Sequence, residues 1–159
     1  DELFGNIFGF ETETKAEALT MQQLDKLNPS LFEAAIAALY KQQGFDVHLT
    51  PYSNDKGVDV VLLGDQDSYL LQVKQTKTLV GRDAIQEIYT AKSYYENKFN
   101  TKFKLTAVAN NDFSSTATML AQSNSVELVN RQQLIKMIDR HQITIMDINK
   151  IESQRMQRI

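Results

Sequence analysis

The segment VDVVLLGDQDSYLLQVK, residues 58–74, decides the fold. It holds two short runs rich in β-branched, aliphatic and aromatic residues, VDVVLL (58–63) and SYLLQVK (68–74), which are typical of strands. The four residues between them, GDQD, are turn formers. The segment therefore predicts a β-hairpin. A loop of this length sets a register in which opposed residue numbers sum to 131, so that Leu63 faces Ser68.

The same register brings three polar residues together. Asp59 faces Gln72, and Lys74 projects from the same face two residues farther along. A carboxylate, an amide and an amine then converge, while Leu71 and Val73 point to the opposite face. Structural explanations compete with this, because Asp59 can accept hydrogen bonds in a turn and Lys74 can be an exposed lysine at a strand end. A shift of register by one residue would separate the three side chains.

Helices and further strands surround the hairpin. Pro29 begins a predicted helix that runs to Gln43, followed by Gly44 as a left-handed residue. Strands are also predicted at 45–50, 102–109 and 125–129, helices at 82–97, 114–122 and 131–140, and a β-like stretch, ITIMDI, at 143–148. Because strands alternate with helices, the sequence predicts an α/β domain with a parallel crossover. We expect residues 1–27 to form a linker or arm with a short helix, and residues 28–159 to form one compact domain.

The amino-acid composition excludes several kinds of metal and nucleotide site. The 159 residues include no cysteine and two histidines, which excludes disulfides, thiolate zinc sites and multi-histidine metal centres. The six glycines match neither a phosphate-binding loop nor a dinucleotide-binding fingerprint. The longest apolar run, residues 34–40, is far shorter than the roughly 20 residues that span a bilayer, so we expect a cytoplasmic domain. The chain starts at Asp1 without an initiator methionine, and we expect it to be part of a longer protein.

Charge is unevenly distributed along the chain. The net charge is −3, but residues 72–104 carry seven bases against three acids. This basic stretch permits phosphate binding, although a solvated helix face is the usual explanation of a mildly basic stretch. It is therefore compatible with a nucleic-acid partner without indicating one by itself.

The polar cluster in the hairpin suits phosphodiester hydrolysis. The carboxylate of Asp59 can hold a hard cation beside the scissile phosphate. The amine of Lys74 can position or deprotonate water and stabilise developing charge. Since the available ligands are oxygens, we expect the cofactor to be Mg²⁺, for which Mn²⁺ can substitute.

Several segments resemble the Mrr-like branch of the PD-(D/E)XK restriction-endonuclease superfamily, which includes type IV restriction endonucleases. They are SLFEAAIAALYKQQGFDV (30–47), DKGVDVVLL (55–63), LLQVKQTK (70–77), AIQEI (84–88) and FSSTATMLAQSNSVELV (113–129). The resemblance covers roughly residues 28–140. It implies a restriction-endonuclease-like fold, in which a central mixed sheet of four to five strands is flanked by helices in the order αβββαβ followed by αβα. It also implies a metal-dependent DNA endonuclease acting in restriction, defence or DNA processing.

The resemblance assigns roles to individual residues. Asp59, Gln72 and Lys74 stand at catalytic positions, with Gln72 in place of the motif's second acid. Glu33 corresponds to a glutamate on the preceding helix that completes or orients the metal shell. Asp59, Glu33 and the backbone carbonyl of Val73 are the metal ligands that the resemblance implies.

Glu33 has a competing structural interpretation. Ser30 and Glu33 have the spacing of a capping box, in which Glu33 accepts a hydrogen bond from the backbone N–H of Ser30 and never meets a metal. The sequence leaves both interpretations open.

Contacts to DNA are predicted beside this cluster. Lys77 follows the second hairpin strand, and Arg82 and Gln86 begin the next helix, although exposed side chains of these types are usually only solvated. Proteins of the resembling family often form dimers or larger assemblies and carry a separate recognition domain. We therefore expect DNA, a second copy of the chain and an additional recognition domain or segment as partners. Two alternative functions are a catalytically weak or inactive nucleic-acid-binding or sensor module of the same fold, and an RNA-directed nuclease.

Overall fold

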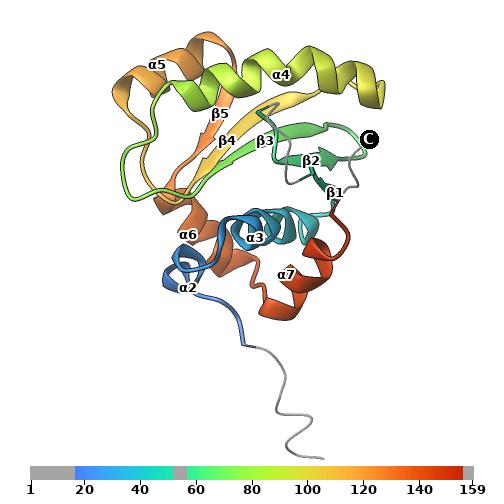
Figure 1. Ribbon diagram of the computed structural model, residues 1–159, viewed down its shortest axis with the longest axis vertical. Coiled ribbons are helices and arrows are strands. Elements are labelled where there is room, and N and C mark those ends of the chain that lie inside the picture. The colour runs from blue at the N-terminus through green and yellow to red at the C-terminus, as the bar shows by residue number, and fades with distance from the viewer. Residues whose placement is uncertain (1–16, 52–56, 156–159) are drawn as a thin grey trace, which may run out of the picture.

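A five-stranded mixed sheet forms the centre of the computed structural model, which describes residues 17–51 and 57–155 (Figure 1). The strands lie side by side in chain order, as β1 (Asp46–Leu49), β2 (Val60–Leu63), β3 (Tyr69–Lys74), β4 (Lys104–Ala109) and β5 (Val126–Val129). β2 runs antiparallel to both of its neighbours, whereas β3, β4 and β5 are parallel. The mixed sheet of four to five strands flanked by helices, predicted from the sequence, is confirmed.

The hairpin has the predicted register. Val60 pairs with Leu71 and Leu62 pairs with Tyr69, so that opposed numbers sum to 131. The turn between the strands is closed by Ser68, whose hydroxyl accepts a hydrogen bond from the N–H of Gly64 at 3.2 Å. A short polar turn between two apolar strands that are buried on both faces fixes this pairing.

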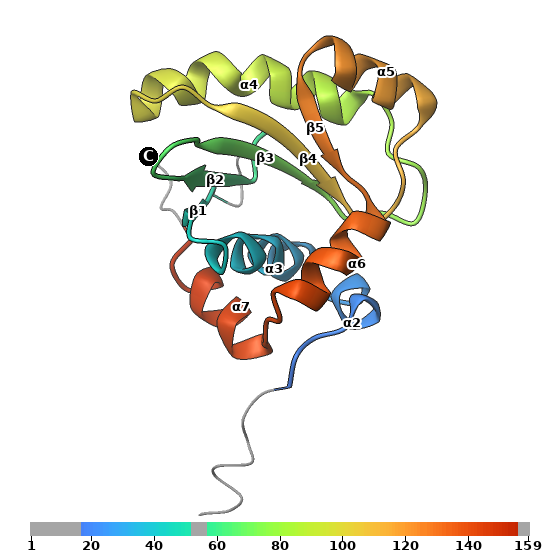
Figure 2. The same ribbon diagram turned by 180° about the vertical axis from the view of Figure 1, so that it is seen from behind.

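Helices cover both faces of the sheet (Figures 1 and 2). α3 (Pro29–Lys41), α6 (Arg131–Arg140) and α7 (Ile145–Glu152) lie on one face together with the short α2 (Met21–Asp25), and α4 (Asp83–Phe99) and α5 (Ser115–Ser123) lie on the other. The side chains of successive strand residues alternate between the two resulting cores, as expected for a sheet buried on both sides. None of the described helices is long and apolar enough to span a membrane.

α3 begins at Pro29, as its sequence predicts, and ends at Lys41, shortly before the predicted end at Gln43. The side chain of Asn28 caps it by accepting a hydrogen bond from the N–H of Leu31 at 2.9 Å, and Pro29 occupies the first helical turn. Gly44 follows the helix with φ +103°, the left-handed conformation that glycine adopts without strain. Phe32, Ile36 and Leu39 are fully buried and attach the helix to the sheet.

One predicted element is wrong. The stretch 143–148 was expected to be β-like, but α7 begins within it, at Ile145. Thr144 caps the helix in a capping box with Asp147, and Ile148 and Ile151 are buried at helical spacing. Tertiary burial of this apolar stripe outweighs the strand preference of β-branched residues, which is a weak determinant by itself.

The topology directs several helix N-termini toward one end of the sheet. α4 and α5 connect parallel strands, so each starts near the carboxyl ends of the strands and runs back along the sheet. α6 starts directly after β5, and α3 runs back to the start of β1, so both also begin at this end. Because β2 is antiparallel to its neighbours, its first residue lies at the same end.

Candidate active site

Asp59 lies immediately before β2, at the end of the sheet where the parallel strands β3, β4 and β5 finish. Its backbone N–H donates to the carbonyl of Leu71 at 2.8 Å, and its own carbonyl accepts from the N–H of Thr50 at 3.0 Å. Its carboxylate oxygen Oδ2 accepts a hydrogen bond from the backbone N–H of Val73 at 2.7 Å. Since peptide groups two residues apart along a strand point the same way, the carbonyl of Val73 is also directed toward Asp59. The carboxylate thus extends the sheet where β2 has not yet begun.

Gln72 lies near Asp59 but does not face it as a strand partner. β2 starts at Val60, and the N–H of Asp59 is bonded to Leu71 rather than to Gln72. The side chain of Gln72 is 3% exposed and points to the α4 face, where its Nε2 donates to Oε1 of Glu87 at 2.5 Å. Gln72 and Lys74 are therefore brought together by Glu87, a residue that the sequence does not single out.

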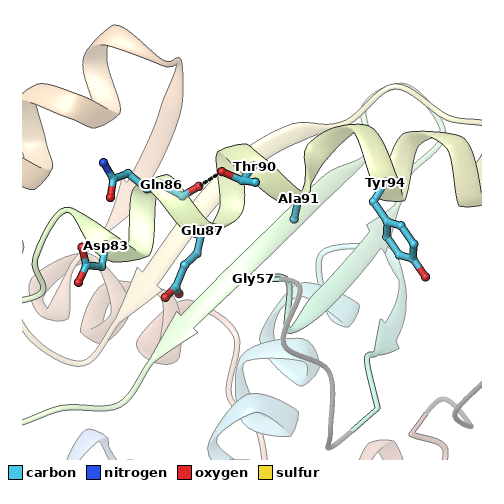
Figure 3. A pocket seen from close by; sticks show the side chains of 7 residues that line it. All are labelled: Gly57, Asp83, Gln86, Glu87, Thr90, Ala91 and Tyr94. Carbon is cyan, nitrogen blue, oxygen red and sulfur yellow. Dashed lines mark hydrogen bonds between the residues drawn. The ribbon is translucent and has the colours of Figure 1, made fainter.

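Glu87, from α4, joins the two polar side chains of β3. Its Oε1 lies 3.4 Å from Nζ of Lys74 and also receives the hydrogen bond from Gln72. Figure 3 shows the side chain of Glu87 extending from the helix toward the sheet, whereas that of Gln86 points away from it. The signal that could have identified Glu87 is its position beside the buried stripe that includes Ala84 and Ile88.

Gly57 determines how closely the chain before β2 approaches α4. A Cβ atom at this position would lie 2.5 Å from the carbonyl oxygen of Glu87, closer than any side chain can come. Its φ of +85° is also a conformation that other residues rarely adopt. A glycine is therefore required where the segment leading to Asp59 contacts the turn of α4 that carries Glu87 (Figure 3).

Glu33 is oriented by Arg155 and not by a capping box. The cap of α3 is Asn28, two residues before Ser30, so the alternative in which Glu33 bonds back to Ser30 is wrong. Instead, Oε1 of Glu33 accepts a hydrogen bond from Nη1 of Arg155 at 3.0 Å. Glu33 and Asp59 line the same cavity of about 440 Å³, at the start of α3.

The pKa values of both carboxyls in this cavity are raised. Burial and the neighbouring charge of Asp59 raise the pKa of Glu33 to about 7, against the opposing effect of Arg155. Burial raises the pKa of Asp59 to about 6, although the N–H of Val73 and the cations Lys74 and Arg155 oppose the rise. A cavity in which two acids resist ionisation favours a bound cation.

The donor set fits a magnesium ion. Among the residues that the structure describes, no three His, Cys, Asp or Glu side chains form a metal-binding cluster. Two carboxylates and one backbone carbonyl nevertheless supply hard oxygen ligands, and water fills the remaining positions of such an ion in many proteins. Within residues 17–51 and 57–155, Oε2 of Glu33 and Oδ1 of Asp59 have no hydrogen-bond partner.

The three residues predicted to contact DNA are exposed, and none of them lines the cavity of Glu33 and Asp59. Gln86 lines a cavity of about 500 Å³ together with Glu87. Lys77 lines a second cavity, of about 600 Å³, beyond the end of β3. Arg82 is the residue before α4 and its side chain makes no capping hydrogen bond.

Several solved structures share the fold of the chain. The chain resembles MspJI restriction endonuclease, solved in complex with a 27-mer oligonucleotide, at 17% identity and a TM-score of 0.57 over 87% of this chain and 37% of MspJI. It resembles the DNA modification-dependent restriction endonuclease AspBHI at 16% identity and a TM-score of 0.56 over 84% of this chain and 37% of AspBHI. It resembles EndoMS, solved in complex with double-stranded DNA, at 16% identity and a TM-score of 0.52 over 71% of this chain and 45% of EndoMS.

These likenesses establish the fold, and the chain spans less than half the length of each of these three proteins. No curated protein has a sequence that matches the chain. A family model described as restriction endonuclease, of the Mrr catalytic type, matches residues 24–138 and so includes Glu33, the hairpin and α4. The chain therefore belongs to the restriction-endonuclease family of Mrr-type catalytic domains.

Proposed function

We propose that this chain is the catalytic domain of a Mg²⁺-dependent DNA endonuclease that hydrolyses phosphodiester bonds. The observation that carries the proposal is the position of the Asp59 carboxylate, which is bonded to the backbone of Val73 and lines the same cavity as Glu33. Lys74 is the residue after Val73 on β3. Membership of the restriction-endonuclease family supports the same reaction class.

The position of the site also suits a phosphate. Four helices, α3 to α6, start at the end of the sheet where Asp59 lies. The N-terminus of a helix carries partial positive charge and orphan N–H donors, so it attracts phosphate groups. Ligands of α/β proteins bind at the carboxyl ends of parallel strands for this reason.

Each residue of the proposed site has a task. Asp59, Glu33 and the carbonyl of Val73 would hold Mg²⁺, which when bound polarises a phosphoryl oxygen and acidifies water. Lys74, whose charge acts on Asp59, would orient the attacking water and stabilise negative charge on the phosphate. Glu87 fixes the amine from one side, and Gln72 anchors Glu87 through its amide.

DNA is the proposed substrate. MspJI, solved with a 27-mer oligonucleotide, and EndoMS, solved with double-stranded DNA, share the fold. We assign backbone contacts to Lys77, Arg82 and Gln86, which are exposed around the site. Because the chain covers 37% of AspBHI, a restriction enzyme that depends on DNA modification, we propose that a separate segment selects the target in a restriction or defence role.

Cleavage of supercoiled plasmid tests the proposal. We expect Mg²⁺-dependent nicking that a chelator abolishes. The variant Lys74→Met keeps the apolar stem and removes the amine, so its cleavage rate should fall by at least about 10², as for the loss of a positioned acid–base group. Lys104→Met is the matched control, because this exposed lysine pairs with Asp67 at the far end of the sheet.

The rival function is a nucleic-acid-binding or sensor module that has lost turnover. The neutral Gln72 at the position of the second acid favours it, together with the absence of a cluster of three metal-binding side chains in the described part of the chain. Full cleavage by Lys74→Met would contradict the proposed mechanism. Tight DNA binding by the wild type without cleavage in either Mg²⁺ or Mn²⁺ would establish the rival, and cleavage of RNA in place of DNA would change the substrate.

A further inference from the structure

Arg155 is a buried cation at the edge of the candidate site. Its side chain is 5% exposed, and it follows α7, the last helix of the described chain. It lies outside residues 24–138, which the family model matches. An arginine is almost never buried unless its charge is paired and its N–H groups are bonded, so its partners indicate why it is there.

The guanidinium joins the end of α7 to two segments that line the cavity of Asp59, the start of α3 and the residue after β1. Nη1 donates to Oε1 of Glu33 at 3.0 Å and to the carbonyl of Thr50 at 2.8 Å. Nη2 donates to the carbonyl of Ser30 at 3.1 Å and to Oε1 of Glu152 at 2.8 Å, and Nε donates to Oε2 of Glu152 at 3.1 Å. The start of α3, the end of β1 and the end of α7 are thereby fixed to one another. α7 also packs along α3, as Figure 1 shows.

The charges around Arg155 leave the cavity anionic. Both carboxylate oxygens of Glu152 accept hydrogen bonds from the guanidinium. The negative charge of Glu152 therefore balances the positive charge of Arg155. The single bond to Glu33 therefore orients that carboxylate more than it neutralises it. Glu33 uses only Oε1 for this contact, and Oε2 has no partner in the described part of the chain.

We propose that Arg155 is a positioning residue, which holds the carboxylate of Glu33 beside Asp59 so that both can bind one divalent cation. The inference rests on the proposed function, because it requires a cation in this cavity. It assigns a part of the site to the segment after α7, 122 residues from Glu33 along the chain.

Calorimetric titration of Mn²⁺ into the full chain tests this role without a cleavage assay. Lysine keeps the charge of Arg155 but lacks the planar fork, so Arg155→Lys cannot hold Glu33, Thr50 and Ser30 together. We expect Arg155→Lys and Glu33→Gln each to weaken Mn²⁺ binding about 10-fold, the effect typical of residues that orient metal ligands. The double variant should bind no more weakly than Glu33→Gln alone.

A purely structural arginine gives a different pattern. It would leave Mn²⁺ affinity unchanged, or would weaken it by the same factor whether or not Glu33 is present. Arg140→Lys, at the exposed end of α6, is the matched control, and thermal melting verifies that each variant is folded. Glu152→Gln is a second variant that tests the role of Arg155, because it weakens the hold on the guanidinium and leaves more of the positive charge of Arg155 acting on Glu33. Its effect on Mn²⁺ binding should likewise disappear when Glu33 is replaced.

The outcomes separate the inference from the proposed function. Weaker Mn²⁺ binding by Glu33→Gln together with unchanged binding by Arg155→Lys and Glu152→Gln would overturn the role of Arg155 and leave the nuclease proposal standing. Equal losses with and without Glu33 would overturn it as well. If the wild-type chain binds no Mn²⁺, both the role of Arg155 and the proposed metal-dependent function are contradicted.

Discussion

Glu33 and Asp59 make the site sensitive to pH. Their pKa values are raised to about 7 and about 6, so in the metal-free protein both carboxyls hold protons at pH 5.5 and are largely ionised at pH 8. Protons and Mg²⁺ compete for the same oxygens. We expect the Mg²⁺ concentration needed for half-maximal cleavage to rise steeply as the pH falls below about 7. Glu33→Gln removes one titrating group, so its requirement should be higher at pH 8 and less dependent on pH.

Melting of the metal-free protein provides the control for this prediction. Because the folded pKa values lie above the ordinary values of 4.5 and 3.8, protonation favours the folded state. The contribution is complete below about pH 4 and is lost as the pH rises through about 6 and 7. The melting temperature should therefore fall by several degrees between pH 5 and pH 8, and Mg²⁺ should restore it at pH 8. A metal requirement that does not change with pH would contradict the assignment of both acids.

The site residues that the sequence predicted and those that it missed differ in how far apart their partners lie. Asp59 and Lys74 belong to one hairpin, so alternation and loop length place them near each other. Glu87 enters through the packing of α4 on the sheet, and its partners are 13 and 15 residues away. Arg155 meets Glu33 across 122 residues, and no local pattern encodes that contact.

At the scale of elements, Gly57 controls the contact between the chain before β2 and α4. A methyl group there would lie 2.5 Å from the backbone of Glu87 and would have to be accommodated at φ +85°. We expect Gly57→Ala to destabilise the fold by about 1–3 kcal/mol and to lower cleavage further than stability alone explains, because α4 must move with Glu87. Urea unfolding and plasmid cleavage measure the two effects.

Two other glycines supply matched controls. Gly44 has φ +103° but open space around it, so Gly44→Ala isolates the conformational cost. Gly81 has open space and no positive φ, so Gly81→Ala should be near neutral. If Gly57→Ala behaved like Gly44→Ala in both assays, the contact with α4 would have no role in the site.

Elements were predictable where local chemistry and burial agree. The hairpin, α3 and α6 combine clear turn or cap residues with the period of their buried side chains. α7 was wrongly expected to be β-like because its first residues are β-branched. Thr144 and Asp147 have the spacing of a capping box and so encode the start of the helix. The burial that outweighs the strand preference comes from the packing of α7 against α3, which the sequence does not show.

At the scale of the whole molecule, one site can cut one strand at a time. Cutting both strands of a duplex needs two sites that face opposite strand polarities, which a twofold homodimer supplies. We therefore expect the chain to nick plasmid at low concentration and to make linear product increasingly as its concentration rises. A plasmid time course at several protein concentrations measures the ratio of linear to nicked product.

Mixing experiments sharpen this prediction. Adding excess Lys74→Met chain to a fixed amount of wild type should raise the share of nicked product, because mixed dimers contain one competent site. A constant ratio of linear to nicked product at every concentration, with or without the variant, would mean that the two cuts are independent events.

The contact between Glu33 and Arg155 also has a consequence during synthesis. At about 5–20 residues per second, the ribosome adds the 122 residues that separate them in about 6–24 s. When Val129 has been added, α3 and all five strands have been synthesised, but Glu33 still lacks the guanidinium that orients it. We expect the growing polypeptide to acquire its full metal affinity only after Arg155 has been added, so that it passes close to nucleic acid before it is able to cut it.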